Sequence, residues 1–253
     1  MTKDEVRRYL EFYQDIGVKT LYRRAAPGFT IATDSSQAQN PKPQVPNLSP
    51  GPPSPLVPSL EPVHDNLLKI LQDIGDCKRC RLHEGRNRIV FGAGAEQARL
   101  VFVGEGPGAD EDAQGLPFVG RAGQLLTQMI EGTARKEGIP LQRSDVYICN
   151  VVKCRPPENR TPQPDEMEIC GQFLFRQLVA IRPKAICALG STAAKAILGT
   201  KEGVTRLRGK WLQWRDIPVM VTYHPSYLLR PYNQNAKKEA WEDLKKALHY
   251  VYD

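Results

Sequence analysis

Short apolar runs alternate with helical periodicities along the last three quarters of the chain. Four runs are rich in apolar residues and end in glycine, proline or polar residues, which predicts buried strands at 99–104, 145–152, 184–190 and 217–223. Apolar residues recur at helical spacing between and after these runs, which predicts helices at 120–138, 165–181, 191–198 and 236–250. This alternation predicts an α/β fold with three α/β/α layers, in which helices cover both faces of a four-stranded parallel sheet.

Polar residues stand at the ends of three predicted strands. Glu105 follows the first strand, Asn150 lies near the end of the second, and His224 follows the fourth. Because open parallel sheets bind ligands beyond the carboxyl ends of their strands, we expect these side chains to share one site. Asn150 also needs a hydrogen-bond partner, since burying an unpaired amide in an apolar strand is costly.

The first quarter of the chain has a different pattern. Apolar residues at helical spacing predict one helix within residues 1–26, which either packs on the main domain or binds a partner protein, because a single helix cannot form a core. Nine of the 21 prolines lie between Pro41 and Pro62, which predicts an extended, disordered linker over residues 27–62. A plain spacer is favoured over a proline-rich ligand for an SH3-type domain. The main domain is therefore expected at residues 63–253.

Composition narrows the class of protein. The chain of 253 residues is 41% hydrophobic and 25% charged, near the averages of globular proteins. Residues 1–63 hold 7 basic and 6 acidic residues, so +6 of the net charge of +7 falls on the remainder, which is consistent with a polyanionic partner. No apolar run approaches the ~18 residues of a bilayer span, and no apolar leader follows the first residues. We therefore expect no membrane contact and a cytoplasmic monomer.

Four of the six cysteines lie outside the predicted strands. Cys149 and Cys187 fall inside apolar strand patterns and are interpreted as small buried residues. The others form a C-x2-C pair and a second pair separated by fifteen residues: Cys77, Cys80, Cys154 and Cys170. Disulfides are rare in the cytoplasm, so four thiolates point to Zn²⁺ or to an iron–sulfur cluster. The spacing alone does not choose between these two, and a set of free thiols is the third alternative.

Three motifs accompany these cysteines. The first is Gly104-Glu-Gly-Pro-Gly108 with Gly115-Leu-Pro-Phe-Val-Gly-Arg-Ala-Gly123, the second is Asn150-Val-Val-Lys-Cys-Arg-Pro-Pro157, and the third is Tyr223-His-Pro-Ser-Tyr-Leu-Leu-Arg230. In order and spacing they resemble the family 4 uracil-DNA glycosylases, the iron–sulfur members of the uracil-DNA glycosylase superfamily. The resemblance covers essentially all of residues 65–250, and residues 1–60 have no counterpart in the short members of that family.

The resemblance implies a function and a cofactor. It implies an enzyme that flips uracil out of single- or double-stranded DNA and hydrolyses the N-glycosidic bond, which leaves an abasic site and initiates base excision repair. It also implies a four-stranded parallel sheet between helices and a structural [4Fe–4S] cluster. The implied cluster ligands are Cys77, Cys80, Cys154 and Cys170. The resemblance therefore favours an iron–sulfur cluster over zinc.

The same resemblance assigns roles in a uracil pocket. Phe118 stacks on the base, and Asn150 accepts a hydrogen bond from uracil N3–H while it donates one to O4. His224 donates to uracil O2 and stabilises the leaving anion. The backbone amides of Glu105 and Gly106 contact the base.

The group that activates water is less well defined by the sequence. Related families carry a carboxylate two residues after the strand-end glycine, where this chain has Gly106. Glu105 is the nearest carboxylate and the catalytic candidate, and Asp110 and Glu111 are further candidates. A pocket that stabilises both developing charges can supply much of the rate without a general base.

The segment after His224 is expected to hold DNA. The candidates are Ser226, Leu228, Leu229, Arg230 and, at the start of a predicted helix, Arg121. One of the two leucines is expected to wedge into the base stack that the flipped nucleotide leaves, and Arg230 to contact phosphate. The alternative is that the leucines begin the packing of the last helix. Further candidates for phosphate contacts are Lys153, Arg155, Arg160, Arg206 and Lys210.

Three other functions compete with this one. A covalent or non-catalytic uracil-DNA binder of the same superfamily carries a histidine in a basic insert after the Asn-x-Val-Lys stretch, whereas here Cys154 follows directly. An electron-transfer iron–sulfur protein gives no role to Asn150 or His224. A regulatory module would make the N-terminal helix the main functional part.

Overall fold

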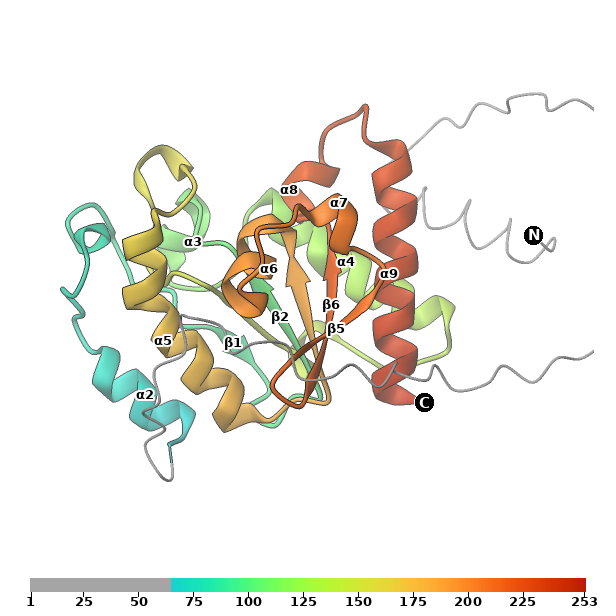
Figure 1. Cartoon of the computed structure of the whole chain (residues 1–253), viewed down its shortest axis with the longest axis horizontal. Coiled ribbons are helices and arrows are strands. Elements are labelled where there is room, and N and C mark those ends of the chain that lie inside the picture. The colour runs from blue at the N-terminus through green and yellow to red at the C-terminus, as the bar shows by residue number, and fades with distance from the viewer. Residues whose placement is uncertain (1–64) are drawn as a thin grey trace, which may run out of the picture.

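The computed structural model describes residues 65–253, and the predicted N-terminal helix and linker lie outside the described residues. Within this part, a mixed six-stranded sheet with the order β1-β3-β2-β4-β6-β5 forms the centre (Figure 1). The strands are β1 (Ala93–Gly94), β2 (Leu100–Gly104), β3 (Tyr147–Asn150), β4 (Ala185–Leu189), β5 (Trp211–Trp214) and β6 (Ile217–Thr222). The α-helices are α2 (Leu67–Ile74), α3 (Ala109–Gln114), α4 (Arg121–Lys136), α5 (Pro164–Ile181), α6 (Gly190–Leu198), α7 (Val204–Leu207), α8 (Pro225–Leu228) and α9 (Gln234–Tyr252). The short 3-10 helices are η1 (Arg81–His83), η2 (Arg143–Asp145) and η3 (Pro157–Asn159). None of the described helices has the length and apolar character of a bilayer span.

The four central strands confirm the predicted parallel sheet. β2 pairs in parallel with β3 and β4, and β4 pairs in parallel with β6. The edge strands β1 and β5 run antiparallel to β3 and β6, and the sequence pattern did not predict them. β1 has only two residues, and β5 mixes apolar and polar residues in a strand that is mostly half-buried. Neither edge strand therefore has the continuous run of apolar residues that marks a central strand in the sequence.

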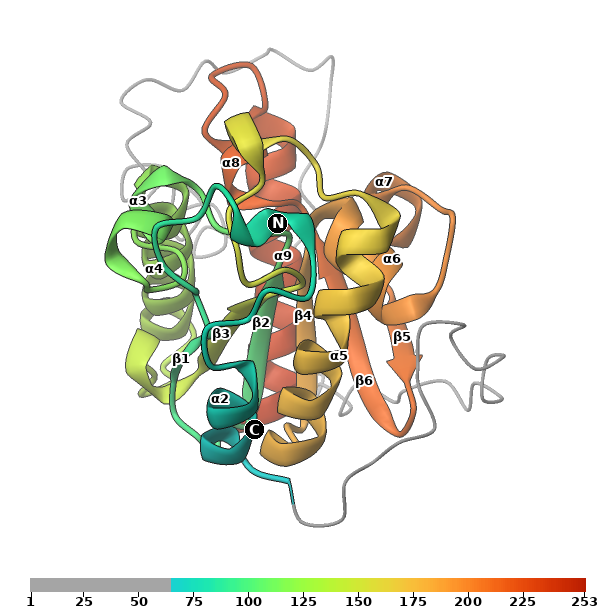
Figure 2. The ribbon, with the colours of Figure 1, turned by 90° about the vertical axis from the view of Figure 1, so that its left-hand side faces the viewer.

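Both faces of the sheet are buried, which explains the continuous apolar runs. In β2, Leu100 and Phe102 pack with α4 and α9, whereas Val101 and Val103 pack with α2, α5 and α6. Figures 1 and 2 show α5 and α9 on opposite sides of the sheet. Because successive side chains of a strand point to opposite faces, a strand between two helix layers needs apolar residues at every position. The predicted three-layer arrangement is confirmed.

The register of the strands aligns their carboxyl ends. Gly104 of β2 stands opposite Asn150 of β3, and β4 and β6 also end in register. The end of β6 is fixed from α9, where the buried Asp243 accepts hydrogen bonds from Thr222 Oγ1 at 2.9 Å and from Arg208 Nη2 at 2.6 Å. The segments that follow these strands therefore start from one edge of the sheet, where the sequence places its unusual polar residues.

Candidate active site

Gly104, the last residue of β2, is the point where two predicted site residues meet. A Cβ atom at Gly104 would lie 2.5 Å from Asn150 Oδ1 and 2.5 Å from Phe118 Cζ. These distances are too short for any side chain, so only glycine lets the amide and the ring approach this backbone. The carboxyl end of β2 thus forms the floor of a site that Asn150 and Phe118 line.

Phe118 lies in the loop between α3 and α4, in a strained conformation. Its φ is 53°, in the left-handed region that is costly for an aromatic residue. Its side chain is buried, and its ring centroid lies 5.6 Å from that of His224 at an interplanar angle of 39°. A Cβ at Gly123 would overlap the Phe118 carbonyl, so this glycine allows α4 to pack under the loop. The loop therefore holds Phe118 against His224, as expected for two walls of one pocket.

Glu111 of α3 clamps the loop that carries Phe118. Its Oε1 accepts hydrogen bonds from the backbone N–H groups of Val119 at 2.8 Å and Gly120 at 2.9 Å, and its Oε2 accepts from Gly108 N–H at 3.1 Å. On the other side of the loop, Arg143 Nη2 donates to the Pro117 carbonyl at 2.7 Å. Glu111 thus positions this loop, a role that the sequence did not reveal.

Replacing Glu111 by glutamine should destabilise the fold, because an amide has one acceptor oxygen where the carboxylate has two. We expect the free energy of unfolding to fall by about 1–3 kcal/mol, the cost of leaving buried donors unpaired. Urea denaturation measures this change. Glu168→Gln, at an exposed position of α5, is the matched control and should be within about 0.5 kcal/mol of the wild type. Equal stability of the two variants would contradict the clamp.

Asn150 presents an unpaired acceptor to the site. The residue is 1% exposed, and its Oδ1 is buried without a hydrogen-bond partner in the structure. Leaving a buried acceptor unpaired costs about 1–3 kcal/mol, and a ligand that supplies a donor here would remove that cost. The carbonyl oxygen of Asn150 accepts a hydrogen bond from Lys153 Nζ at 2.8 Å, which fixes the backbone that carries the amide.

His224 caps the N-terminus of α8 and is held in one tautomer. Its Nδ1 accepts a hydrogen bond from Ser226 N–H at 3.2 Å and lies 2.7 Å from Ser226 Oγ. A backbone N–H can only donate, so the ring proton belongs to Nε2. Burial lowers the pKa of His224 to about 4, although the charge of Glu111 opposes the shift. At neutral pH, His224 is therefore a neutral donor through Nε2–H.

Glu105 follows Gly104 at the same edge of the sheet. Its Oε2 accepts a short hydrogen bond from Thr192 Oγ1, which comes from the first turn of α6. Its carbonyl accepts from Val152 N–H at 3.2 Å, which continues the pairing of β2 with the segment after β3. At the next position, a Cβ on Gly106 would lie 2.8 Å from Val152 Cγ2, so glycine lets Val152 pack against this backbone. Thr192 thus fixes the orientation of the Glu105 carboxylate.

The loop between α8 and α9 rises beyond the carboxyl edge of the sheet (Figures 1 and 2). Leu229 is 42% exposed, whereas Leu228 is 1% exposed and packs in the core with α4 and α9. Leu228 is therefore a packing residue, and only Leu229 remains as the candidate wedge. Arg230 is exposed, and its Nη1 lies 3.4 Å from Oη of Tyr232, which is 75% exposed and was not singled out in the sequence.

The basic candidates divide into exposed and buried residues. Arg121 is exposed at the start of α4, as expected for a residue that contacts phosphate. Lys153 is fully buried, so its prediction as a phosphate contact is wrong. The reason is that Lys153 follows β3 into the layer between the sheet and α5, where Gln177 Oε1 accepts from its Nζ at 2.6 Å.

The cysteines divide as the sequence predicted. Cys149 and Cys187 are fully buried on β3 and β4, and burial raises the pKa of both thiols. The other four lie at the start of the described chain, after β3 and on α5: Cys77, Cys80, Cys154 and Cys170. All six are free thiols.

The four cysteines outside the strands converge on one region. Arg86 Nη1 donates to the Cys77 carbonyl at 2.5 Å and lies 3.5 Å from Cys154 Sγ. The backbone N–H of Lys153 donates to Cys170 Sγ at 3.2 Å. Burial raises the pKa of Cys154, and the neighbouring Arg86 opposes this shift. In residues 65–253, no three His, Cys, Asp or Glu side chains are grouped closely enough to be a metal-ion site as they stand.

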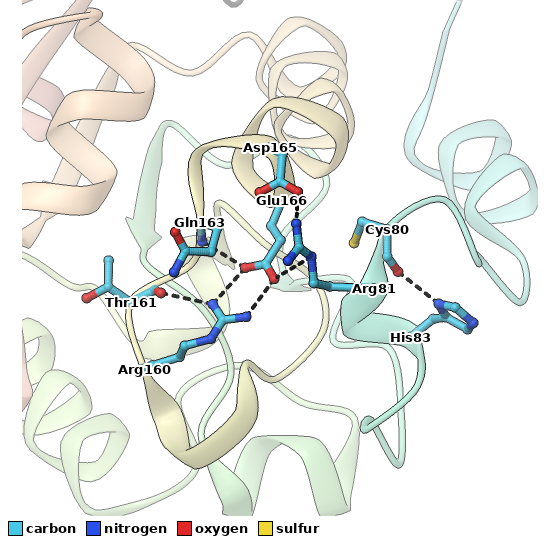
Figure 3. A network of polar contacts seen from close by, with 8 residues as sticks. All are labelled: Cys80, Arg81, His83, Arg160, Thr161, Gln163, Asp165 and Glu166. Atoms are coloured by element: carbon cyan, nitrogen blue, oxygen red, sulfur yellow. Dashed lines mark hydrogen bonds and ion pairs between the residues drawn. The ribbon is translucent and has the colours of Figure 1, made fainter.

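An ion-pair network ties the C-x2-C segment to α5 (Figure 3). Glu166 is fully buried and accepts hydrogen bonds from Arg160 at 2.6 and 2.8 Å and from Gln163 N–H at 2.7 Å. Arg81, directly after Cys80, pairs with Asp165 and approaches Glu166 at 3.7 Å. The network therefore joins residues that lie more than eighty positions apart and supports the region where the four cysteines meet.

Comparison with known proteins places the chain in a family. A family model described as the uracil DNA glycosylase superfamily matches residues 91–245. The chain is 46% identical to the type-4 uracil-DNA glycosylase of Thermotoga maritima over 190 residues, which are 74% of this chain and 96% of that protein. The chain belongs to the uracil DNA glycosylase superfamily. It is also 44% identical to the type-4 uracil-DNA glycosylase of Archaeoglobus fulgidus over 190 residues, 72% of this chain and 92% of that protein.

Membership of the uracil DNA glycosylase superfamily confirms the resemblance found in the motifs. The matched residues include the four side chains that the sequence assigns to the uracil pocket: Glu105, Phe118, Asn150 and His224. A more distant similarity, 31% identity over 164 residues, joins the chain to a type-5 uracil-DNA glycosylase of Pyrobaculum aerophilum. The sequence identities thus favour the type-4 group within the superfamily.

Proposed function

We propose that this protein is a uracil-DNA glycosylase, and that residues 63–253 form its catalytic domain. The observation that carries the proposal is the junction of the buried, unpaired Oδ1 of Asn150, the ring of Phe118 and the neutral His224 at one strand edge. These groups offer a hydrogen-bond acceptor, an aromatic face and a hydrogen-bond donor to one planar ligand. The type-4 relatives, named for activity on uracil in DNA, support this assignment.

Asn150 would read the edge of the base. Uracil presents a donor at N3 and an acceptor at O4, so the Asn150 Oδ1 gains the partner that it lacks, and the amide N–H₂ donates to O4. Cytosine presents an acceptor at N3 and an amino group at the 4-position, which would leave the Asn150 amide facing like groups. Phe118 would stack on the base, and the backbone amides of Glu105 and Gly106 would contact it. The pocket therefore favours uracil, because a complex with cytosine would leave the polar groups of Asn150 unpaired.

His224 would act on the departing base. As the bond between uracil N1 and C1′ breaks, both electrons go to the base, and negative charge builds on O2. The Nε2–H of His224, held by the contact of Nδ1 with Ser226, would donate to this oxygen. Because its pKa is lowered to about 4, the ring is neutral and does not need to lose a proton before it binds substrate. Its donor is preorganised, which costs no reorganisation during the reaction.

Glu105 would act on the sugar side of the bond. Positive charge develops on the deoxyribose, and water adds to C1′ and releases a proton to solvent. The Glu105 carboxylate, oriented by Thr192, would hold this water and stabilise the positive charge. Asp110 lies on the first turn of α3 with its carboxylate beside Gly120, and Glu111 is committed to backbone N–H groups. Glu105 is therefore the carboxylate that we assign to this role.

Leu229 would wedge into the DNA stack, while Ser226, Arg230 and Arg121 contact the backbone around it. We expect Leu229→Ala to lower kcat/KM on uracil in duplex DNA about tenfold, because alanine is too small to fill the gap that the flipped base leaves in the stack. The loss on single-stranded DNA should be smaller, since little stacking has to be broken. Steady-state assays on both substrates measure this difference. An equal loss on both would argue that Leu229 serves the fold or the pocket and not the opening of the duplex.

We further propose that Cys77, Cys80, Cys154 and Cys170 hold a [4Fe–4S] cluster. Four free thiols from three parts of the chain, with Arg86 and the Lys153 N–H beside two of the sulfurs, fit such an anionic group. When bound, the cluster would supply a covalent cross-link between the start of the domain, the segment after β3 and α5. Zinc is the alternative that metal analysis would reveal.

Replacing Cys170 by serine tests the cluster. We expect the purified variant to lose most of its iron and sulfide and to unfold at a lower temperature, because one of the cluster ligands is lost. Cys187→Ser is the matched control, since this thiol is also buried but lies on β4, outside the set of four. Iron analysis and thermal denaturation should separate the two variants. Iron retained in Cys170→Ser, or zinc found in the wild type, would contradict the proposed cluster.

A gel assay tests the proposed activity. The protein is incubated with DNA that carries one uracil, as a single strand or opposite guanine or adenine, and abasic sites are then cleaved with alkali. We expect strand cleavage at the uracil position and none in matched DNA with thymine or cytosine there. No cleavage in any uracil substrate would overturn the proposal. A protein–DNA adduct that survives denaturation would instead favour the covalent binder of the same superfamily.

A further inference from the structure

Lys153 has a buried ammonium group that the proposed chemistry does not use. The residue is fully buried, with 0% of its surface exposed to solvent. Its Nζ donates to the Asn150 carbonyl at 2.8 Å and to Gln177 Oε1 at 2.6 Å, and both acceptors are neutral. Burying a charge between neutral partners costs free energy, because neither acceptor replaces the solvation of an ion in full. The two hydrogen bonds offset part of this cost and hold both acceptors in place.

The partners of Lys153 are themselves held in place. Gln177, near the C-terminal end of α5, donates through Nε2 to the Phe91 carbonyl at 3.0 Å and to Tyr147 Oη at 3.1 Å. Gln177 therefore cannot turn its oxygen away from Lys153 without losing two further hydrogen bonds. The ammonium is fixed from α5, and through it the carbonyl at the end of β3 is fixed as well.

Lys153 also touches the cysteine region through its backbone. Its N–H donates to Cys170 Sγ at 3.2 Å. Cys170 and Gln177 are seven residues apart on α5, so they lie on the same face of the helix, two turns from each other. Lys153 thus contacts α5 at both Cys170 and Gln177, and it also binds the carbonyl of Asn150, whose Oδ1 is unpaired.

We propose that Lys153 is a positioning residue that holds Asn150 in register for base recognition and ties that register to the cysteine region. The proposal rests on the proposed function, since Asn150 must read uracil for its position to matter. The side chain of Asn150 follows its backbone, so release of the carbonyl would let the amide drift from the base. A displacement of about 1 Å in such a group can lower a rate about 100-fold.

A double-mutant cycle tests this link. The variants are Lys153→Met, Asn150→Ala and the two combined, with kcat/KM for uracil release measured per active site. Methionine keeps the length of the side chain without its charge, which spares the fold an unpaired ion. Tyr147→Phe is the matched control, because it removes the far end of the same buried network while Gln177 keeps the Phe91 carbonyl. If Lys153→Met gives no soluble protein, Lys153→Gln takes its place.

We expect Lys153→Met to lower kcat/KM about 10- to 100-fold and to add less than about threefold to the loss caused by Asn150→Ala, since both changes remove the same recognition. Tyr147→Phe should have less than a threefold effect. Iron content should stay at the wild-type level, because the backbone N–H to Cys170 is unchanged. Losses that multiply in the double variant, or loss of iron, would overturn the positioning role. A wild type that releases no uracil would instead overturn the proposed function, and the inference with it.

Discussion

Replacing His224 by alanine is expected to lower the single-turnover rate constant of uracil release by about 100- to 1,000-fold, the usual cost of losing one preorganised donor to a developing anion. The imidazole packs beside the Phe118 ring and is held by Ser226. Its removal therefore deletes the donor without changing the core of the sheet. Binding to undamaged DNA should change little. His249→Ala is the control, because this histidine pairs with Glu137 and Asp253 at the far end of α9. Equal losses in catalysis and in DNA binding would contradict the role of His224.

The pH dependence of the same rate constant follows from the lowered pKa. With a pKa of about 4, His224 stays neutral from about pH 5.5 upwards, and the rate should show no inflection near the ordinary histidine value of 6.5. The unfolded chain binds a proton at His224 between pH 6.5 and 4, and the folded chain does not. Stability therefore falls as the pH falls through this window, and His224→Ala should reduce that fall. A single-turnover profile that rises through pH 6.5 and is lost in His224→Ala would contradict the neutral donor.

Replacing Asn150 by leucine is expected to lower activity without lowering stability. Leucine has about the shape of asparagine but offers no polar atom, so uracil N3–H and O4 would be buried without partners. A loss in kcat/KM of about 100-fold or more is expected. The free protein, by contrast, no longer buries an unpaired Oδ1, and its free energy of unfolding should stay equal or rise.

Asn235→Leu is the control for Asn150→Leu, because Asn235 is exposed in the first turn of α9 and lies outside the sheet. Uracil release and urea denaturation are measured on all three proteins. A large drop in stability with Asn150→Leu would mean that the amide has a structural partner in the free protein. Full activity would mean that another group reads the base.

The central sheet and the pocket could be predicted from the sequence for a common physical reason. Strands buried on both faces leave continuous apolar runs, and a polar residue at the end of such a run, as at Asn150, stands out because burial makes it costly. Phe118 and His224 came from motifs whose glycines and prolines fix tight turns. The edge strands β1 and β5 had no such signature, since one is too short and the other is only partly covered.

The sequence did not predict roles that depend on contacts between distant segments. The clamp by Glu111 and the hydrogen bond from Thr192 to Glu105 exist only once loops from different strands meet. Lys153 looked like a surface cation because its neighbours in sequence are motif residues, while its burial depends on α5. Leu228 and Leu229 are chemically identical neighbours, and only the orientation of α8 decides which one faces solvent.

The most direct test of the account follows both products of one reaction by mass spectrometry. A single turnover is run with DNA that contains one isotopically labelled uracil, and the free base and the intact mass of the protein are measured together. The account predicts one labelled uracil released per DNA molecule, an abasic strand, and a protein mass that does not change. Labelled uracil that stays in the DNA, or a protein that gains the mass of the DNA strand, would contradict it.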